Sequence, residues 1–452
     1  MLRISKKLFA SYPDSDSQLA KNLRRNQMGK ILFKWSLTVF FGTILFLFSQ
    51  NSFAGGFYLP EIATPGSVGT AGVANVTNVD DASSAFTNPA GMTALEADEV
   101  EAGMEVLIPV NKFDSDIATA GGDDGGNAGN PAAIPGLFVV KGLNDNLKLG
   151  FSIAAVAGGG LDYGENFVGR YQAYKAVLQT VGFGPSLGYK INDMLSIGAG
   201  VYMIQTTFNE KIAVNQSFFG ANDGTVQFQD INDIGYQWNA GLIFKPTDRL
   251  LFGFTYLSEA DIDLSGDLKT SGLQGAFQNL LGDTDSITVS FDLPEAFTFG
   301  LRYRATEKLT LLADSNYQRW SQFSKNNVSI DVGPTGNAAT TTIDRDWKDT
   351  WHVGGALKYD FGANHIVGMG ISYDSSPVTN HDRTADLPLD EQFRVAAAYG
   401  KDNPIGLAYS FSASYVYFGE GKMDQTAQGE RFKGKFDTNY LVFVAASVHY
   451  RF

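Results

Sequence analysis

The chain ends with the stretch Tyr440-Leu441-Val442-Phe443-Val444-Ala445-Ala446-Ser447-Val448-His449-Tyr450-Arg451-Phe452, and this stretch decides the fold. Its even-numbered residues are all apolar or aromatic, whereas the residues between them include a serine, a histidine and an arginine. Successive side chains on a strand point to opposite faces, so the stretch predicts a strand with one apolar and one mixed face. The same alternation recurs, for example over 195–203 and 407–417, and gives fourteen such segments between Glu99 and Phe452.

The composition of the second face separates two classes of all-β protein. A soluble sandwich also alternates, so alternation alone does not decide. Here the second face repeatedly carries Gly, Ser, Thr, Asn, Gln and isolated charges, while the apolar face ends in Tyr, Phe and Trp. A wet lumen and two aromatic girdles are typical of barrels in bacterial outer membranes. The sequence therefore predicts a 14-stranded antiparallel transmembrane β-barrel over residues 99–452.

The spacers between the segments alternate in length, which predicts the topology. Six are short and rich in Gly, Asn, Asp and Pro, as tight turns require. Seven are long, and such barrels have short periplasmic turns and long outer loops. We therefore expect both chain ends on the short-turn side. The long spacers are expected at about 112–133, 158–180, 210–231, 262–285, 325–342, 375–390 and 419–434.

Composition excludes several classes of protein. The formal charge is −14 and the mature part has no basic cluster, so no nucleic-acid partner is expected. No apolar run long enough for a helical membrane span occurs after residue 60. There is no cysteine, which suits an oxidising compartment.

The first 54 residues resemble an export signal. Lys30 and Lys34 precede an apolar stretch over 35–48, and Ser52-Phe53-Ala54 has the form of a cleavage site. We expect a signal peptide over 1–54, cut after Ala54, with translation starting at Met1 or at Met28. The alternative is a retained amphipathic anchor.

Residues 55–98 differ from everything that follows. They are small and glycine-rich, with neither strand nor helix periodicity, and Asn88-Pro89 would end a short helix. A barrel of this size leaves a channel unless something fills it. The sequence predicts that 55–98 form a plug, or hatch, folded into the lumen, and the alternative is a periplasmic tail.

Several motifs, in order along the mature chain, resemble the long-chain fatty-acid outer-membrane transporter family (FadL/TodX type). The resemblance implies fourteen strands, a hatch containing Asn88, Pro89 and Ala90, and passive uptake of hydrophobic molecules, with long-chain fatty acids as the first expectation. The motifs are Gly56-Phe57-Tyr58-Leu59-Pro60-Glu61, Asp80-Asp81-Ala82-Ser83, Asn88-Pro89-Ala90-Gly91-Met92, Leu293-Pro294-Glu295, Trp320-Ser321-Gln322-Phe323, Trp347-Lys348-Asp349-Thr350, and Arg383-Thr384 with Leu387-Pro388.

The chain departs from the family pattern in one place. After Leu387-Pro388 the family commonly continues with an acidic residue and then Asp-Arg, whereas this chain reads Leu389-Asp390-Glu391-Gln392. A positive charge is thus missing where the loop could meet a carboxylate. Uptake of aromatic or other neutral hydrocarbons is therefore the alternative, followed by a general porin.

Three groups of residues are candidates for the transport site. Two arginines could meet a ligand carboxylate or pair with other lumenal charges. Two apolar loops could capture substrate at the outer surface, or their apolar side chains could pack together as the cores of the loops. The resemblance suggests a kink at three glycines that opens the wall sideways, and the alternative is a flexible loop start. These residues are Arg302 and Arg394; Phe167, Tyr171, Tyr174, Leu273, Phe277 and Leu280; and Gly158, Gly159 and Gly160.

No enzyme is expected. Gly184-x-Ser186-x-Gly188 matches a hydrolase motif but lies within a strand. The four histidines are scattered, so no catalytic residue, cofactor or metal is predicted. The expected partners are a hydrophobic small molecule, outer-membrane lipid and lipopolysaccharide, and the outer-membrane assembly machinery acting through Phe452. We expect a monomer in the outer membrane of a Gram-negative bacterium.

Overall fold

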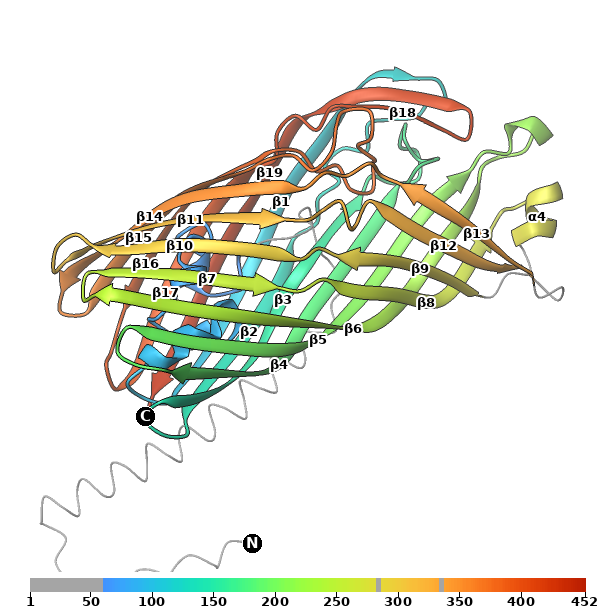
Figure 1. Cartoon of the computed structure of the whole chain (residues 1–452). Helices are drawn as coiled ribbons and strands as arrows, with labels where there is room; N and C mark the ends of the chain where they lie inside the picture. Colours follow the sequence, from blue (N-terminus) through green and yellow to red (C-terminus); the bar gives the residue numbers. More distant parts are fainter. Residues whose placement is uncertain (1–59, 282–285, 333–336) are drawn as a thin grey trace, which may run out of the picture. The chain divides into compact units, whose positions relative to one another are not determined.

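The computed structural model describes residues 60–281, 286–332 and 337–452 (Figure 1). The predicted signal peptide, its cleavage after Ala54 and the start at Met28 lie outside these residues, as do residues 55–59 of the predicted hatch. Within the described ranges, no helix has the length and apolar content needed to cross a bilayer.

One antiparallel sheet closes on itself and forms the barrel. The first strand, β1, pairs with β2 on one side and with the last strand, β19, on the other. Among the described residues the chain crosses the wall fourteen times, which confirms the predicted number. The unbroken crossings are β1 (Glu99–Ala118), β2 (Ala132–Gly142), β3 (Leu147–Asp162), β4 (Lys175–Lys190), β5 (Leu195–Val214), β6 (Gly224–Thr247), β15 (His365–Asp374), β16 (Gln392–Lys401), β17 (Gly406–Tyr417) and β19 (Glu430–Arg451).

Four neighbouring crossings are each broken into two strands. A proline follows β9 directly; it has no N–H to donate, so the ladder is interrupted there. The two longest breaks, 319–324 and 345–349, carry buried aromatic side chains (Trp320, Phe323 and Trp347). The broken crossings are β7 (Leu250–Leu257) with β8 (Ala260–Ser271), β9 (Ser286–Leu293) with β10 (Ala296–Arg304), β11 (Leu309–Gln318) with β12 (Lys325–Val332), and β13 (Asn337–Asp344) with β14 (Thr350–Gly362).

The two faces of the wall differ as the alternation predicts. On β5, Val201 is 55% exposed while its neighbour Tyr202 is 1% exposed. On β17, Phe411 is 54% exposed and Ser412 is 7% exposed. Large apolar side chains therefore cover the outside, and small or polar ones face a filled interior, as a wall in contact with lipid requires.

The strands are longer at the long-loop end than predicted. The predicted loop 262–285 contains most of β8, and the predicted loop 325–342 contains β12 and most of β13. The loop predicted over 419–434 contains β18 (Met423–Ala427), which forms a hairpin with β19. The period-two signal fades beyond the apolar band, because neither face is then selected for lipid contact, yet the backbone ladder continues.

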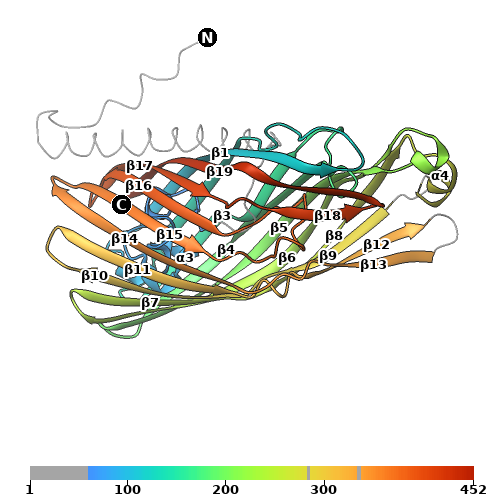
Figure 2. The ribbon, with the colours of Figure 1, turned by 90° about the horizontal axis from the view of Figure 1, so that it is seen from above.

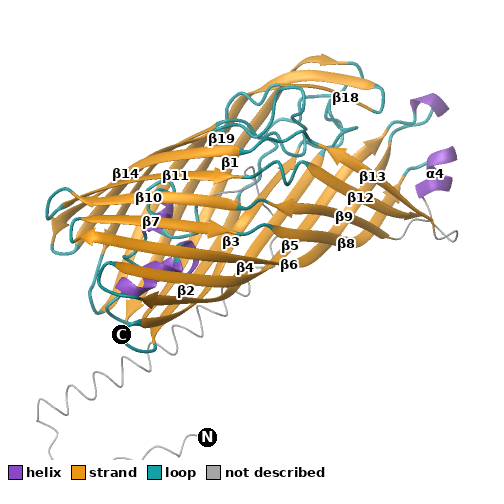
Figure 3. Ribbon diagram, in the orientation of Figure 1, coloured by secondary structure: helices purple, strands orange, loops and turns teal. Residues whose placement is uncertain are grey.

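Residues 60–98, called the N-terminal segment below, lie inside the barrel near the end where the chain terminates (Figures 1 and 2). Most of their side chains are buried. Figure 3 shows short helical turns surrounded by strands. They are α2 (Pro65–Val68), η1 (Asn75–Thr77), α3 (Ser84–Thr87) and η2 (Pro89–Ala94).

Glycines in the wall make room for the N-terminal segment. A Cβ atom added at Gly241 would lie 2.1 Å from Asn88 Oδ1, and one at Gly198 would lie 2.4 Å from the backbone nitrogen of Ala90. Such distances are impossible for real atoms, so the segment touches the wall directly at these glycines. The same holds, against other parts of the segment, at Gly103, Gly150, Gly188, Gly253, Gly300, Gly354 and Gly370. This ring explains part of the chain's high glycine content.

The first prediction concerns this close packing. Replacing Gly241→Val should force Asn88 away from the wall and destabilise the segment by about 1–3 kcal/mol, the usual cost of overpacking. Hydrogen exchange of residues 60–98 in the purified protein measures the effect. Gly355→Val is the matched control, because a Cβ at Gly355 meets nothing within 4 Å. Equal protection in the two variants would contradict the direct contact.

Candidate functional site

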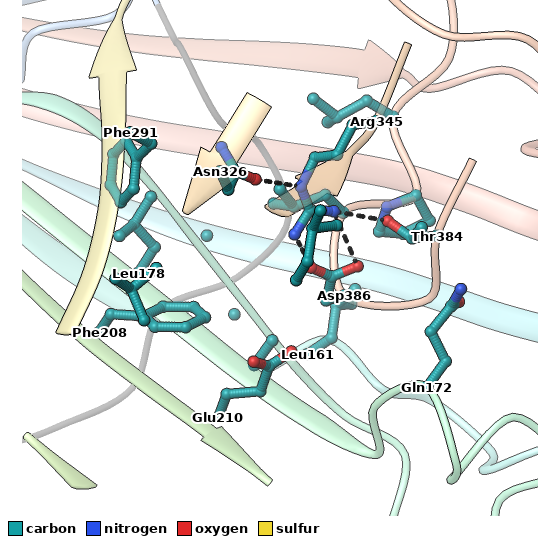
Figure 4. A pocket seen from close by; sticks show the side chains of 18 of the residues that line it. Leu161, Gln172, Leu178, Phe208, Glu210, Phe291, Asn326, Arg345, Thr384 and Asp386 are labelled. Carbon is teal, nitrogen blue, oxygen red and sulfur yellow. Dashed lines mark hydrogen bonds and ion pairs between the residues drawn. The ribbon is translucent and has the colours of Figure 1, made fainter. Parts of the chain in front are cut away.

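A mostly apolar cavity lies inside the wall at the long-loop end. Its volume is about 360 Å³, at the lower end of the range usual for small-molecule sites. Side chains come from several strands and from the loop that follows β15, and Figure 4 shows Leu178, Phe208 and Phe291 on one side. The apolar lining is Leu161, Ala176, Leu178, Phe208, Ile212, Phe228, Val289, Phe291, Phe323, Val328, Ile343, Leu387, Leu389 and Phe418.

The other side of the cavity is polar. Arg345, in the break between β13 and β14, forms a two-pronged ion pair with Asp386, with Nη2–Oδ2 at 2.7 Å and Nη1–Oδ1 at 3.3 Å. Its remaining donors reach Thr384 Oγ1 at 2.9 Å and Asn326 Oδ1 at 2.5 Å. Burial alone would raise the pKa of Asp386, but the Arg345 guanidinium outweighs it and holds the pKa below its usual value.

The wall beside this cavity has a gap between β2 and β3. The two strands pair only from Leu137/Ile153 toward the short-turn end. Beyond that point β3 continues to pair with β4, with a register shift at Val156, between Ala155 and Ala157. In the opposing stretch of β2, Pro135 has no N–H to offer. Residues 132–136 and 154–160 therefore face each other without a ladder, and we call this feature the β2–β3 window.

The three glycines predicted to form the kink border this window. Gly158, Gly159 and Gly160 lie in β3 and pair with β4, and Gly159 and Gly160 also line the cavity. The bulge itself lies just before them, at Val156. A bulge inserts an extra residue into a strand and bends it. The bulge at Val156 therefore bends β3 away from a regular ladder. The role of the glycines in an opening stays a prediction.

The residues proposed as a first apolar loop lie in a packed cluster. Phe167, Tyr171 and Tyr174 are 0%, 8% and 3% exposed. The Phe167 ring stacks on Tyr163 at 4.1 Å between centroids and meets Phe113 edge-on at 5.7 Å. This placement corresponds to the alternative expectation, a loop core.

The second apolar loop lies at the tips of two hairpins. Phe277, on α4 (Gly275–Leu281), meets Phe219 at 6.1 Å between ring centroids, and the adjacent Phe218 is 91% exposed. Leu273 is buried, and the side chain of Leu280 lies outside the described atoms. Phe218 and Phe219, on η3 (Ser217–Phe219), were missed by sequence reasoning, although adjacent phenylalanines in a predicted outer loop are a visible signal.

The two arginines proposed to meet substrate hold the N-terminal segment instead. Arg302 forms a two-pronged ion pair with Asp80, with both N–O distances 2.8 Å, and Lys358 Nζ lies 2.7 Å from the same carboxylate. Burial raises the pKa of Asp80, but these two cations outweigh it and the net pKa lies well below normal.

Arg394 anchors the start of the segment. It forms an ion pair with Asp374, and its Nε lies 3.4 Å from Glu61 Oε1. Both arginines thus match the alternative expectation, pairing with other charges, and neither lines the 360 Å³ cavity. The hatch motif is held by hydrogen bonds of its own: Asn88 Nδ2 donates to the carbonyl oxygen of Val76 at 2.7 Å, and its Oδ1 accepts from the backbone N–H of Ala90 at 3.2 Å.

The polar residues of the cavity were not proposed from the sequence. Arg345, Asp386 and Glu210 are distant in the chain and have no common motif. A usable signal existed for two of them, because Asp386 follows the quoted Arg383-Thr384 pair and Arg345 precedes the Trp347 motif. Nothing in the alternation of β5 distinguishes Glu210 from a solvated charge.

Comparisons with known proteins agree with this architecture. Residues 45–452 match the family described as outer membrane protein transport protein (OMPP1/FadL/TodX). A long-chain fatty acid transport protein of Escherichia coli O6:H1 is 26% identical over 435 residues, covering 87% of this chain and 95% of that protein. Outer membrane protein P1 of Haemophilus influenzae is 23% identical, covering 84% of this chain and 91% of that protein.

Solved structures share the fold. A Pseudomonas aeruginosa FadL homologue superposes with a TM-score of 0.79 at 22% identity, covering 88% of this chain and all of that one. The Pseudomonas putida toluene transporter TodX gives a TM-score of 0.63 at 16% identity, covering 87% of this chain and 99% of that one.

The family match spans all of the described residues, and the closed barrel with its apolar cavity is what such a protein needs. The family consists of transport channels and not of enzymes. The chain therefore belongs to the outer membrane protein transport protein family (OMPP1/FadL/TodX) and is an outer-membrane transporter of hydrophobic substrates.

Proposed function

We propose that this protein takes up long hydrophobic molecules by passive diffusion, from the outer loops into the 360 Å³ cavity and then sideways through the β2–β3 window into the membrane. The observation that carries the proposal is the position of the cavity: Gly159 and Gly160 belong both to its lining and to the edge of the window. A hydrophobic molecule that follows this route avoids the aqueous periplasm. Each Å² of apolar surface kept from water contributes about 25 cal/mol.

Capture begins at the exposed hairpin tips. Phe218, Phe219 and Phe277 form an apolar patch at the ends of the β5–β6 and β8–β9 hairpins. Exposed aromatic patches of this kind usually serve binding. The buried cluster around Phe167 supports the neighbouring loops and has no direct contact with substrate in this scheme.

Long-chain fatty acids are the substrate class that the relatives favour. Two relatives from Escherichia coli that match over 95% of their length are named long-chain fatty acid transport proteins. Aromatic hydrocarbons are the second candidate, because the chain shares its fold with a toluene transporter and Arg345, the cation among the described lining residues, already pairs with Asp386. Growth of a transport-deficient host on each carbon source, with and without this chain, decides between them. Loss of both kinds of growth would refute the proposal.

The N-terminal segment acts as the hatch in this scheme. Its contacts with the glycine ring and its ion pairs to Arg302, Lys358 and Arg394 support a plug that blocks the axial path. Steady single-channel conductance in planar bilayers should then be small. A large steady conductance would favour the general porin.

The second prediction tests the hatch anchor. Asp80→Asn leaves Arg302 and Lys358 without their carboxylate and should destabilise the segment by about 1–3 kcal/mol. Hydrogen exchange and conductance measure the loss, with the exposed Asp116→Asn as the matched control.

The same anchor has a defined pH dependence. The pKa of Asp80 is depressed in the folded protein. Its stabilisation is therefore complete above about pH 4, the ordinary value for Asp, and is lost as the pH falls further. Wild-type protein should lose segment protection below that pH, whereas Asp80→Asn should lack this part of the change. Identical pH profiles would refute the anchor.

The third prediction concerns the lateral window. Deleting Val156 removes the extra residue of the bulge and should let β3 continue its ladder toward β2, which closes the window. Uptake of a radiolabelled fatty acid by whole cells should fall at least about tenfold, while the amount of folded barrel stays unchanged. The substitution Val156→Ala keeps the bulge and is the control. Unchanged uptake after the deletion would exclude the lateral route.

A further inference from the structure

One acidic side chain in the cavity has no partner. Glu210 lies on β5 beside a register shift and is 9% exposed. Among the described residues, no side chain forms a hydrogen bond or an ion pair with its carboxyl group, and Figure 4 shows this group pointing into the space beneath the Arg345–Asp386 pair. A buried carboxyl group without a partner is costly unless something that enters the cavity satisfies it.

The cation in the same cavity already has an acidic partner. All three guanidinium nitrogens of Arg345 donate to protein acceptors, two of them to Asp386. A ligand carboxylate that replaced Asp386 on this guanidinium would leave Asp386 as an unpaired buried charge.

The charges around the cavity therefore oppose an anion. Its ionisable lining residues are Glu210, Asp386 and Arg345, of which Asp386 and Arg345 form the ion pair. The remaining polar lining is uncharged and consists of Asn111, Gln172, Asn326, Thr341, Thr384 and Asn439. A ligand carboxylate brought close to Asp386 in this apolar enclosure is repelled more strongly than in water.

We propose that the cavity selects hydrophobic molecules with an uncharged hydroxyl-bearing head group, and that Glu210 accepts the hydrogen bond from that hydroxyl. This inference rests on the proposed function and specifies its substrate class. The hydroxyl can belong to a long-chain alcohol or to the protonated form of a fatty acid. In either case the apolar chain packs against Leu178, Phe208 and Phe291 while the ionised carboxylate is rejected.

The test compares two probes of equal chain length, a long-chain alcohol and the corresponding carboxylate, by calorimetry with the full-length mature barrel in lipid nanodiscs. At about pH 8, where an ordinary carboxyl is ionised, the alcohol should bind at least about tenfold tighter. At about pH 5 the acid should approach the alcohol, because more of it is protonated. An acid that stays about tenfold weaker at this pH identifies the alcohol as the source of the hydroxyl. Carboxylate binding as tight as that of the alcohol at about pH 8 would overturn the proposal.

Two variants locate the selectivity. Glu210→Gln should weaken binding of the alcohol and strengthen binding of the carboxylate. The ratio of the two affinities should therefore fall toward one. Asp386→Asn frees donors of Arg345 and should reverse the preference toward the carboxylate. The matched control is Glu165→Gln, which removes one exposed acid outside the cavity and should leave the ratio unchanged.

The outcomes separate this inference from the proposed function. A ratio that does not change in Glu210→Gln refutes the role of Glu210, even if both probes bind. If neither probe binds the wild-type barrel, the cavity is not a substrate site and the proposed function itself fails.

Discussion

The whole molecule depends on one constraint: a strand that crosses a bilayer must pair its backbone N–H and C=O groups on both sides. The pairing of β1 with β19 meets this constraint by closing the sheet, and it continues from Glu99/Arg451 to Ala118/Phe432. Once the sheet is closed, its outside must be apolar and its inside must be filled. The N-terminal segment and the ring of wall glycines fill the short-turn end. The long loops and their aromatic cluster fill the other end and leave the cavity between them.

The β2–β3 window is the place where this constraint is relaxed. Interrupted pairing is tolerable where the freed groups face protein or a cavity, and it is expensive where they face lipid. Here the unpaired stretch adjoins the cavity, and a single register shift at Val156 accompanies it. Bulges in an otherwise regular ladder are over-represented next to functional sites, which is why we propose that the transport route passes there.

The sequence was sufficient for the barrel and insufficient for the pocket. Period-two alternation encodes the lipid-facing band, so strand number, turn positions and the closing strand could be read from residues such as 440–452. The strand ends on the long-loop side could not be predicted, because the strands continue to pair there beyond the band whose outer face must be apolar. The residues of the candidate site were predicted least well from the sequence. Arg302 and Arg394 were recognised as lumenal, but Asp80 and Glu61 lie far from them in the chain, and only the closed fold brings these acids to the two arginines. Glu210, Arg345 and Asp386 converge for the same reason.

A crystal structure of the protein soaked with a long-chain molecule that carries a bromine atom at its tail tests the central claim most directly. We expect the bromine signal in the cavity lined by Leu178, Phe208 and Phe291, with a second position at the β2–β3 window beside Gly158. A continuous track of bromine along the barrel axis, past Asn88 and the N-terminal segment, would contradict it.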